Sequence, residues 1–203
     1  LNSLVQHVES LHPEMLGSIL LVDDDGVHLR LGAAPSLPQS YNQAIDGIAI
    51  GDGVGCCGTA AHRRERVVVD DVRPHPYWVD FREVAERAGL LSCWSQPFYG
   101  VEGRLLGTFA VYHREPRHPT DTEILLIEDY AGLAGLAVEH ARTVQALHEN
   151  EARLRAILGA LPDAVAVTDL AGRILTASPA GVRMFGFERD EEMKLRLLTE
   201  FLV

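Results

Sequence analysis

Three cysteines are the side chains in this sequence with the clearest chemical potential. Cys56 and Cys57 are adjacent within a glycine-rich stretch, and Cys93 lies further along the chain. They include no Cys-x-x-Cys pair and cannot form a disulfide framework, so we expect reduced thiols. A thiol near the start of a helix can have a lowered pKa, because the helix amides favour the thiolate. Cys57 is therefore a candidate redox group, and the alternative is a small buried residue that fills space beside glycines.

The other chemical candidates are histidines and aromatic residues. The nine histidines are scattered, and none forms the i, i+4 pair with a carboxylate that a zinc hydrolase needs. The sequence therefore predicts neither a metal site nor a set of catalytic residues. Trp78, Phe81 and Trp94 could stack on a planar ligand or belong to an ordinary core, and both interpretations stay open.

These side chains must be positioned by short strands and helices. Hydrophobic spacing and turn residues predict a helix over 1–16, strands over 18–22 and 27–31, a strand over 67–69, a helix over 78–89, and strands over 90–98 and 105–112. From Thr120, with Glu123 as its capping-box partner, a long helix begins. This order predicts an α+β fold in which helices cover one antiparallel sheet.

Residues 11–143 resemble the GAF family, of the type found beside PAS domains in sensor histidine kinases and in cyclic-di-GMP synthases and phosphodiesterases. The motifs that carry the resemblance include Gly55-Cys-Cys-Gly-Thr-Ala-Ala61, Asp70-Asp-Val72, Cys93-Trp-Ser95 and Gly107-Thr-Phe-Ala110. The resemblance implies a six-stranded antiparallel sheet, with a long helix at the end of the domain and a small-molecule pocket on one face of the sheet. We expect the ligand-binding residues of that pocket to be Cys57, Thr59, Trp78, Phe81, Cys93 and Trp94.

An enzymatic relative within this family supplies the alternative function. Free methionine-R-sulfoxide reductases also resemble this chain in having a cysteine in the loop where Cys57 stands. The segment that carries their additional cysteine reads His75-Pro-Tyr-Trp-Val-Asp80 here, so Cys57 has no evident resolving thiol. The alternative to ligand sensing is therefore catalysis by a reductase, or by another thiol-based redox enzyme, that uses Cys57.

The cofactor is left unknown by the sequence. Phytochrome-like domains anchor a bilin at a cysteine that precedes a histidine on a helix, whereas Cys93 precedes Trp94 in a predicted strand, so bilin is not expected. His62 and His113 stand where this type of GAF domain usually carries Tyr. Imidazole is a haem ligand, so haem stays an open alternative.

The last part of the chain looks like the opening of a PAS domain. This resemblance rests on the residues Leu161-Pro-Asp-Ala-Val-Ala-Val-Thr-Asp169, Gly172-Arg-Ile174, Pro179-Ala180 and Phe185-Gly-Phe187, with Ser178 where the family usually has Asn. Residues 194–203 depart from the PAS pattern and indicate a foreign or truncated tail. We therefore expect a GAF domain over 1–143, a coiled-coil signalling helix over 144–160, and a partial PAS domain with an atypical tail over 161–203.

The helix between the two domains carries apolar residues at alternating intervals of three and four, which is typical of a coiled-coil seam. This spacing predicts a parallel homodimer, in which Val144, Leu147, Leu154 and Leu158 meet their own copies. The alternative is a helix that folds back on its own sheet. The expected function is a sensory module without catalysis of its own. It relays ligand binding through this helix to the PAS domain and to a histidine kinase or a GGDEF/EAL cyclic-di-GMP output in the same polypeptide.

Composition excludes several other classes of partner. The 203 residues carry a formal net charge of −11, which repels phosphate backbones, so nucleic acid is not an expected partner. The sequence contains no apolar run of about eighteen residues, so it predicts no membrane segment. The start of the chain lacks the features of a signal peptide. We expect a cytoplasmic protein, and the first residue, Leu1, suggests a piece of a longer polypeptide.

Overall fold

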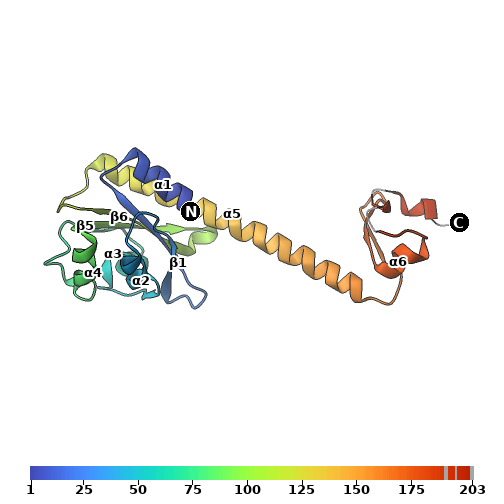
Figure 1. The fold of residues 1–203 in the computed structure, drawn as a ribbon. Helices are drawn as coiled ribbons and strands as arrows, with labels where there is room; N and C mark the ends of the chain where they lie inside the picture. Colours follow the sequence, from blue (N-terminus) through green and yellow to red (C-terminus); the bar gives the residue numbers. More distant parts are fainter. Residues whose placement is uncertain (190–191, 195, 202–203) are drawn as a thin grey trace. The chain divides into compact units, whose positions relative to one another are not determined.

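The computed structural model describes residues 1–189, 192–194 and 196–201, which belong to two compact units, 1–141 and 142–203. In the first unit six strands form one antiparallel sheet in the order β3-β2-β1-β6-β5-β4 (Figure 1). The strands are β1 Leu16–Val22, β2 His28–Ala33, β3 Ile48–Ala49, β4 Val67–Val69, β5 Ser92–Tyr99 and β6 Leu105–His113. The predicted α+β fold with a six-stranded antiparallel sheet is confirmed.

Helices cover both faces of this sheet and bury a separate apolar core on each (Figure 1). One face lies under α2 Gln39–Ile45, α3 Gly55–Arg63 and α4 Arg82–Ala88. The other face lies under α1 Asn2–Leu11 and the first part of α5 Asp121–Ala160. Because strand residues point alternately to the two faces, five of the strands, β1, β2, β4, β5 and β6, contribute to both cores.

Local chemistry explains where several elements begin and end. The predicted capping box is confirmed: the Thr120 amide donates to Glu123 Oε2 at 2.9 Å, and the Glu123 amide donates to Thr120 Oγ1 at 3.3 Å. Gly89 ends α4 in the left-handed conformation, with φ of 69°, as its position in the sequence indicates.

Two helix boundaries differ from the prediction. The first helix ends at Leu11 rather than at residue 16, since Pro13 disfavours helical geometry in the residue before it and lacks an amide to continue the ladder. The predicted helix over 78–89 is divided into a 3₁₀ turn over Pro76–Trp78 and the shorter α4.

The second unit contains a small two-stranded sheet, β7 Ala166–Thr168 with β8 Ile174–Ala177, followed by α6 Pro179–Met184 and a 3₁₀ turn over Leu198–Phe201. Ser178 caps α6 by accepting from the Gly181 amide at 3.1 Å. The same hydroxyl accepts from the Val165 amide at 3.0 Å and donates to the Asp163 carbonyl at 2.8 Å. The serine that replaces the usual Asn therefore ties the segment before β7 to the start of α6.

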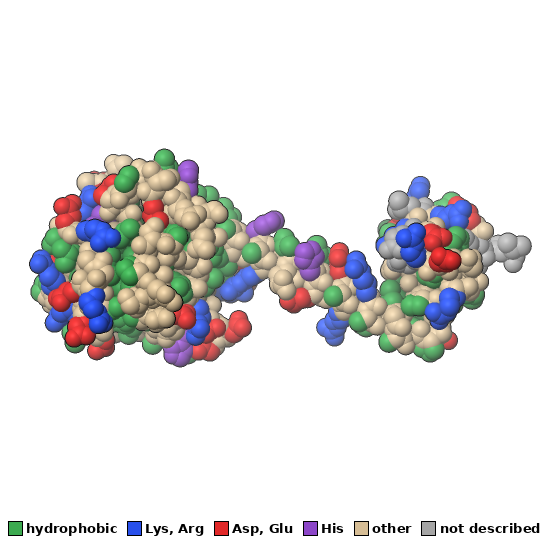
Figure 2. Space-filling model, in the orientation of Figure 1, with side chains coloured by type: hydrophobic (Ala, Val, Ile, Leu, Met, Phe, Trp, Pro, Cys, Tyr) green, Lys and Arg blue, Asp and Glu red, His purple; other side chains and the backbone are tan. Residues whose placement is uncertain are grey.

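Helix α5 has 40 residues and changes character along its length. Up to Val138 it buries Ile127, Ala131, Ala134, Gly135 and Val138 against the sheet. Residues 141–160 are exposed apart from the half-buried Leu158, and apolar side chains alternate there with charged and histidine side chains (Figure 2). Among the described residues, no helix combines the length and hydrophobicity that a membrane crossing requires.

Candidate functional site

A small cavity lies in the first unit, between the sheet and helices α2, α3 and the 76–81 segment. Its volume is about 20 Å³. The cavity is lined by Tyr41, Ile45, Ile48, Gly55, Cys56, Cys57, Trp78, Phe81, Cys93 and Tyr112. Four of the six residues expected at a ligand pocket, Cys57, Trp78, Phe81 and Cys93, therefore come together at this cavity.

Thr59 and Trp94 are not brought into the cavity lining. Thr59 is buried within α3, where its hydroxyl donates to the Gly55 carbonyl at 2.6 Å and accepts from the Gly53 amide at 3.1 Å. It fixes the glycine-rich turn that begins α3. Trp94 follows Cys93 in β5, and strand alternation turns it to the opposite core.

The three thiols at the cavity are all buried. Burial raises the pKa of Cys57 to about 11, and contacts with the hydroxyls of Ser95, Thr108 and Tyr112 offset only part of this effect. Burial also raises the pKa of Cys93 well above its usual value. The Cys56 thiol donates to the Cys93 carbonyl at 3.3 Å. The lowered pKa considered for a cysteine at a helix start is thus wrong for Cys57, because desolvation outweighs the helix amides.

Tyrosines complete the cavity, and sequence reasoning did not place them in the site. The rings of Tyr41 and Tyr112 meet edge to face with centroids 5.6 Å apart. The Tyr112 hydroxyl shares a hydrogen bond of 3.0 Å with Ser18. Strand alternation could have found Tyr112, since it points to the same face as Ala110 in β6.

The Trp78 side chain is 2% exposed, and its Nε1–H has no hydrogen-bond partner within the described residues. Buried indole N–H groups usually find an acceptor. The cavity lining thus combines four aromatic side chains, one of which, Trp78, carries an unused donor, and it contains no charged residue.

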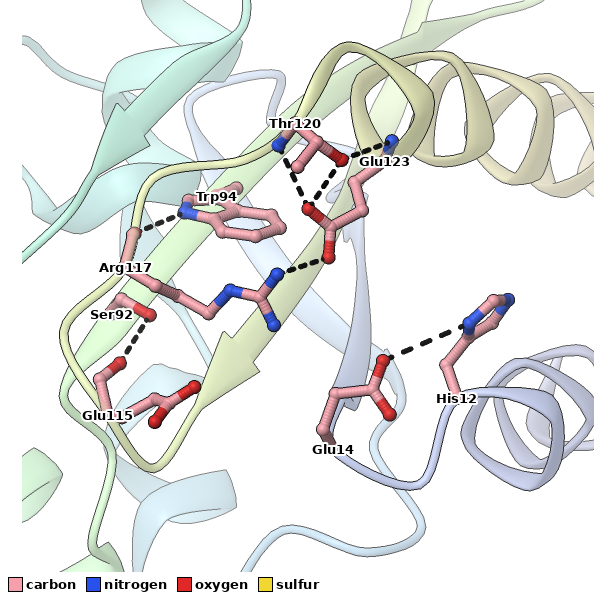
Figure 3. Close-up of polar contacts among 8 residues, drawn as sticks. All are labelled: His12, Glu14, Ser92, Trp94, Glu115, Arg117, Thr120 and Glu123. Atoms are coloured by element: carbon pink, nitrogen blue, oxygen red, sulfur yellow. Dashed lines mark hydrogen bonds and ion pairs between the residues drawn. The ribbon is translucent and has the colours of Figure 1, made fainter.

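On the opposite face, polar contacts tie β5 to the beginning of α5 (Figure 3). The Trp94 indole donates to the Arg117 carbonyl at 3.3 Å, and the Arg117 guanidinium lies 5.4 Å from the indole ring centre. Arg117 also binds Glu123 in the first turn of α5, with a nitrogen–oxygen distance of 2.5 Å. Trp94 itself is 0% exposed, so this link joins the buried core to the polar contacts at its edge.

A second link from β5 to α5 lies two residues further along the strand. The Gln96 side-chain oxygen accepts from Arg66 Nε at 3.0 Å, and Arg66 forms an ion pair with Glu128 of α5. Cys93, Trp94 and Gln96 are thus close neighbours in one strand, with Cys93 at the cavity and the other two connected to α5. Strand β5 touches both the candidate pocket and the long helix.

Neither His62 nor His113 lines the Cys57 cavity. His62 is exposed on α3, and His113 is buried in the core beneath α1 and α5. Across the part of the chain that the structure describes, no three His, Cys, Asp or Glu side chains are grouped so that they could hold a metal ion.

The sequence pattern of the GAF domain family matches residues 1–139, and that of the PAS domain family matches residues 152–203. The chain belongs to the GAF domain family. The PAS match extends over residues 194–203, the tail that we expected to be atypical; residues 195, 202 and 203 lie outside those that the structure describes.

The chain also matches a curated relative that is a sensor protein. The chain is 34% identical over 194 residues to a methyl sulfide methyltransferase-associated sensor from Methanosarcina acetivorans, a match that covers 95% of this chain. This chain spans only 19% of the length of that relative. The order of a GAF domain followed by a PAS domain, in a chain related to a sensor protein, is therefore established.

Three solved structures show the same fold at low sequence identity. A domain assigned to a two-component sensor histidine kinase protein of Sinorhizobium meliloti 1021 is 24% identical, with a TM-score of 0.59 over 72% of this chain and 92% of that one. The free methionine-R-sulfoxide reductase of Thermoplasma acidophilum is 16% identical, with a TM-score of 0.53 over 68% and 89% of the two chains. The DhaR(N)–DhaL complex of E. coli is 18% identical, with a TM-score of 0.55 over 98% of this chain and 66% of that one.

Proposed function

We propose that the GAF domain senses a small, uncharged molecule at the Cys57 cavity and that strand β5 passes its binding to α5. The observation that carries this proposal is the alternation along β5. Cys93 lines the cavity, whereas Trp94 and Gln96 connect to Glu123 and Glu128 of α5 through arginines. A ligand that moves this strand therefore changes contacts at the helix.

The cavity chemistry supports an uncharged ligand with an acceptor atom. The lining is aromatic, aliphatic and thiol, and the neighbouring Trp78 Nε1–H is an unused donor. A volume of about 20 Å³ holds roughly one water molecule, so a larger ligand requires the 76–81 segment or α4 to move outward. In the proposal, ligand binding requires displacement of this covering layer. Occupancy of the pocket therefore changes the structure of the domain.

Native mass spectrometry and an absorption spectrum of the purified chain identify a retained ligand. Hydrogen exchange with and without that compound then tests the relay. We expect altered exchange in β5 and in residues 121–139 of α5, and we expect Gln96→Leu to reduce the α5 response while the exposed control Glu102→Gln preserves it. Exchange changes confined to α2, α3 and α4 would contradict the relay.

The second half of α5 provides the proposed output path, a parallel homodimer. Val144, Leu147 and Leu154 are exposed, and Leu158 is half-buried, so a partner could cover an apolar stripe along this helix. Light scattering is expected to show a dimer at tens of micromolar. A Val144→Glu/Leu154→Glu variant is expected to be monomeric because it introduces four buried like charges into the dimer.

An Arg142→Glu/Ala156→Glu variant is the matched control for this experiment. Each of its substitutions lies two residues, or about 200° around the helix, from a seam residue, and so faces away from the seam. It is expected to remain dimeric. A monomeric wild-type chain, or a fully dimeric Val144→Glu/Leu154→Glu variant, would contradict the seam.

Catalysis through Cys57 is the competing function, and the surroundings of the thiol oppose it. With a pKa raised to about 11 by burial, Cys57 is protonated at neutral pH and is a poor nucleophile. The likeness to a methionine sulfoxide reductase is one of fold. We expect no turnover of free methionine-R-sulfoxide above background with thioredoxin or dithiothreitol, and turnover abolished by Cys57→Ser would assign an enzyme instead.

The proposed setting is a cytoplasmic signalling protein whose output domain, a histidine kinase or a cyclic-di-GMP enzyme, belongs to the same polypeptide. Three free, buried cysteines fit a reducing compartment. The sensor relative is much longer than this chain, which leaves room in such a protein for an output domain. The name of that relative links it to a methyl sulfide methyltransferase and supports a sensory role for this chain, without identifying its ligand.

A further inference from the structure

The sheet face opposite the Cys57 cavity contains a buried histidine whose hydrogen-bonding groups are unused. His113 ends β6, is 1% exposed and packs on Trp94, with ring centres 4.3 Å apart. Neither ring nitrogen has a hydrogen-bond partner among the residues that the structure describes. A neutral imidazole offers one donor and one acceptor, and leaving both unpaired inside a protein is unfavourable. The fold therefore maintains a polar group here that its own side chains do not satisfy.

A cavity of about 330 Å³ adjoins this histidine at the edge of the first unit. It is lined by Pro13, Glu14, Leu16, His113, Arg114 and Glu115. Small-molecule sites in proteins begin at about 300 Å³, so the space suits a compact metabolite. It is much larger than the Cys57 cavity and shares no lining residue with it.

The charges around this cavity favour a cationic guest. Glu14 and Glu115 present carboxylates here (Figure 3). In the described chain, Glu14 has only a contact of 4.0 Å with His12, and no basic side chain pairs with Glu115. Arg114, which also lines the cavity, keeps its charge while it donates to the Ala88 carbonyl at 3.3 Å, so the two carboxylates outnumber it; Arg117 pairs with Glu123. Burial, and then Arg117, lower the pKa of His113 to about 4, so its ring is neutral and keeps an acceptor nitrogen at neutral pH.

We propose that this cavity is a second ligand site, which binds a small organic molecule with a primary ammonium group. The ammonium donates to the carboxylates of Glu14 and Glu115, and a further polar group of the same molecule reaches the His113 ring. A metal ion alone is a poor occupant, because the described residues provide no group of three suitable ligands. The site stands independently of ligand binding at the Cys57 cavity.

Two contacts connect this second site to the rest of the domain. Arg114 reaches the last turn of α4, which adjoins the layer covering the Cys57 cavity. His113 packs on Trp94, which is linked through Arg117 to the start of α5. An ammonium ligand at this site is thus placed to modulate both the cover of the first cavity and the helix that leaves the sheet.

The test is a titration of the whole chain, labelled at histidine, followed by NMR of the imidazole signals at neutral pH. Ethanolamine hydrochloride is the probe, and sodium acetate at equal ionic strength is the control. We expect a saturable shift of the His113 signals with ethanolamine and none with acetate. Glu14→Gln/Glu115→Gln is expected to weaken ethanolamine binding by about tenfold or more, whereas the exposed control Glu102→Gln leaves it unchanged.

Three outcomes would overturn the proposal. They are no saturable His113 shift at millimolar ethanolamine, equal shifts with ethanolamine and acetate, and binding that the Glu14→Gln/Glu115→Gln variant leaves intact. Both substituted residues are on the surface, so a folded variant is expected and its amide spectrum verifies this. Because the readout is at His113, it is separate from any test of the Cys57 cavity.

Discussion

The two faces of the six-stranded sheet differ in their chemistry, although the same sheet forms both. The face under α2, α3 and α4 is uncharged at neutral pH: burial raises the pKa values of Tyr41, Cys57, Cys93 and Tyr112. The face under α1 and α5 contains an apolar core whose edge is closed by ion pairs and hydrogen bonds, among them Arg117–Glu123 and Arg66–Glu128. One face is suited to hold an uncharged ligand, and the other to hold a helix in a defined position.

This difference shows how one sheet can bind a ligand on one face and pass the effect of binding to a helix on the other. Adjacent residues of β5 point in opposite directions, so a displacement felt at Cys93 is also a displacement of Trp94. The two tryptophans of the chain, Trp78 and Trp94, lie one on each face of the first unit. Their fluorescence therefore reports unfolding of this unit alone, and it serves as the measurement in the predictions below.

Acid should destabilise the first unit through the α5 face, and this is the largest effect that we expect. The pKa of His113 is lowered from 6.5 to about 4 in the folded chain, so protonation favours the unfolded state. Stability is full above pH 6.5 and falls as the pH drops toward 4, by about 3 kcal/mol for this group. Urea unfolding at a series of pH values measures the decrease.

The control for the acid effect is His113→Phe, which keeps a ring against Trp94 and removes the titrating group. Glu123 also has a lowered pKa and loses stabilising contacts on protonation, so the wild-type curve contains more than one contribution. The difference between wild type and His113→Phe isolates the histidine. If the two proteins lose the same stability between pH 6.5 and 4, the titration of His113 does not cause the acid destabilisation.

A pair of glycines in α5 tests how closely the helix must approach the sheet. An added Cβ at Gly135 would lie 2.9 Å from the Tyr99 carbonyl oxygen, whereas one at Gly132 meets no atom within 4 Å. We expect Gly135→Ala to cost about 1–3 kcal/mol, because backbone blocks the methyl group. Gly132→Ala should stabilise the exposed side of the helix by about 0.5–1 kcal/mol. Urea unfolding of both variants checks the sign difference, and equal effects would mean that the contact at Gly135 is not tight.

The sequence was sufficient for the fold and insufficient for assigning residues to the two faces. Strand and helix order, the capping box at Thr120 and the family motifs all depend on local patterns, and the structure confirms them. Cys93 and Trp94, which are neighbours in sequence, were both expected in one pocket on the strength of the family resemblance. In a strand, neighbours point apart, and this separates them onto different faces.

The pairing of charges and the pKa of Cys57 were also beyond sequence reasoning, for a different reason. Arg66 and Glu128 are separated by 62 residues, and only the packing of α5 on the sheet brings them together. The helix-start position of Cys57 is visible in the sequence, whereas its burial depends on the glycine-rich turn, the sheet and the tyrosines around it. Local motifs predicted the presence of a site, and its electrostatics depended on contacts between distant segments.

The two indole nitrogens separate the faces with a single substitution on each. Trp94 Nε1 donates to the Arg117 carbonyl, so Trp94→Phe removes a buried hydrogen bond and should cost about 1 kcal/mol or more. Trp78 Nε1 has no partner within the described residues, so Trp78→Phe removes an unsatisfied donor and loses only contact area. We expect Trp78→Phe to be the milder change, and each variant keeps the other tryptophan as its fluorescent reporter of urea unfolding.

A bound ligand reverses this order, because an acceptor on the ligand would use Trp78 Nε1–H in the folded state. Trp78→Phe should then abolish the stabilisation that the ligand gives the wild type, while Trp94→Phe retains it. Equal ligand stabilisation of all three proteins would show that the Trp78 donor does not take part in binding.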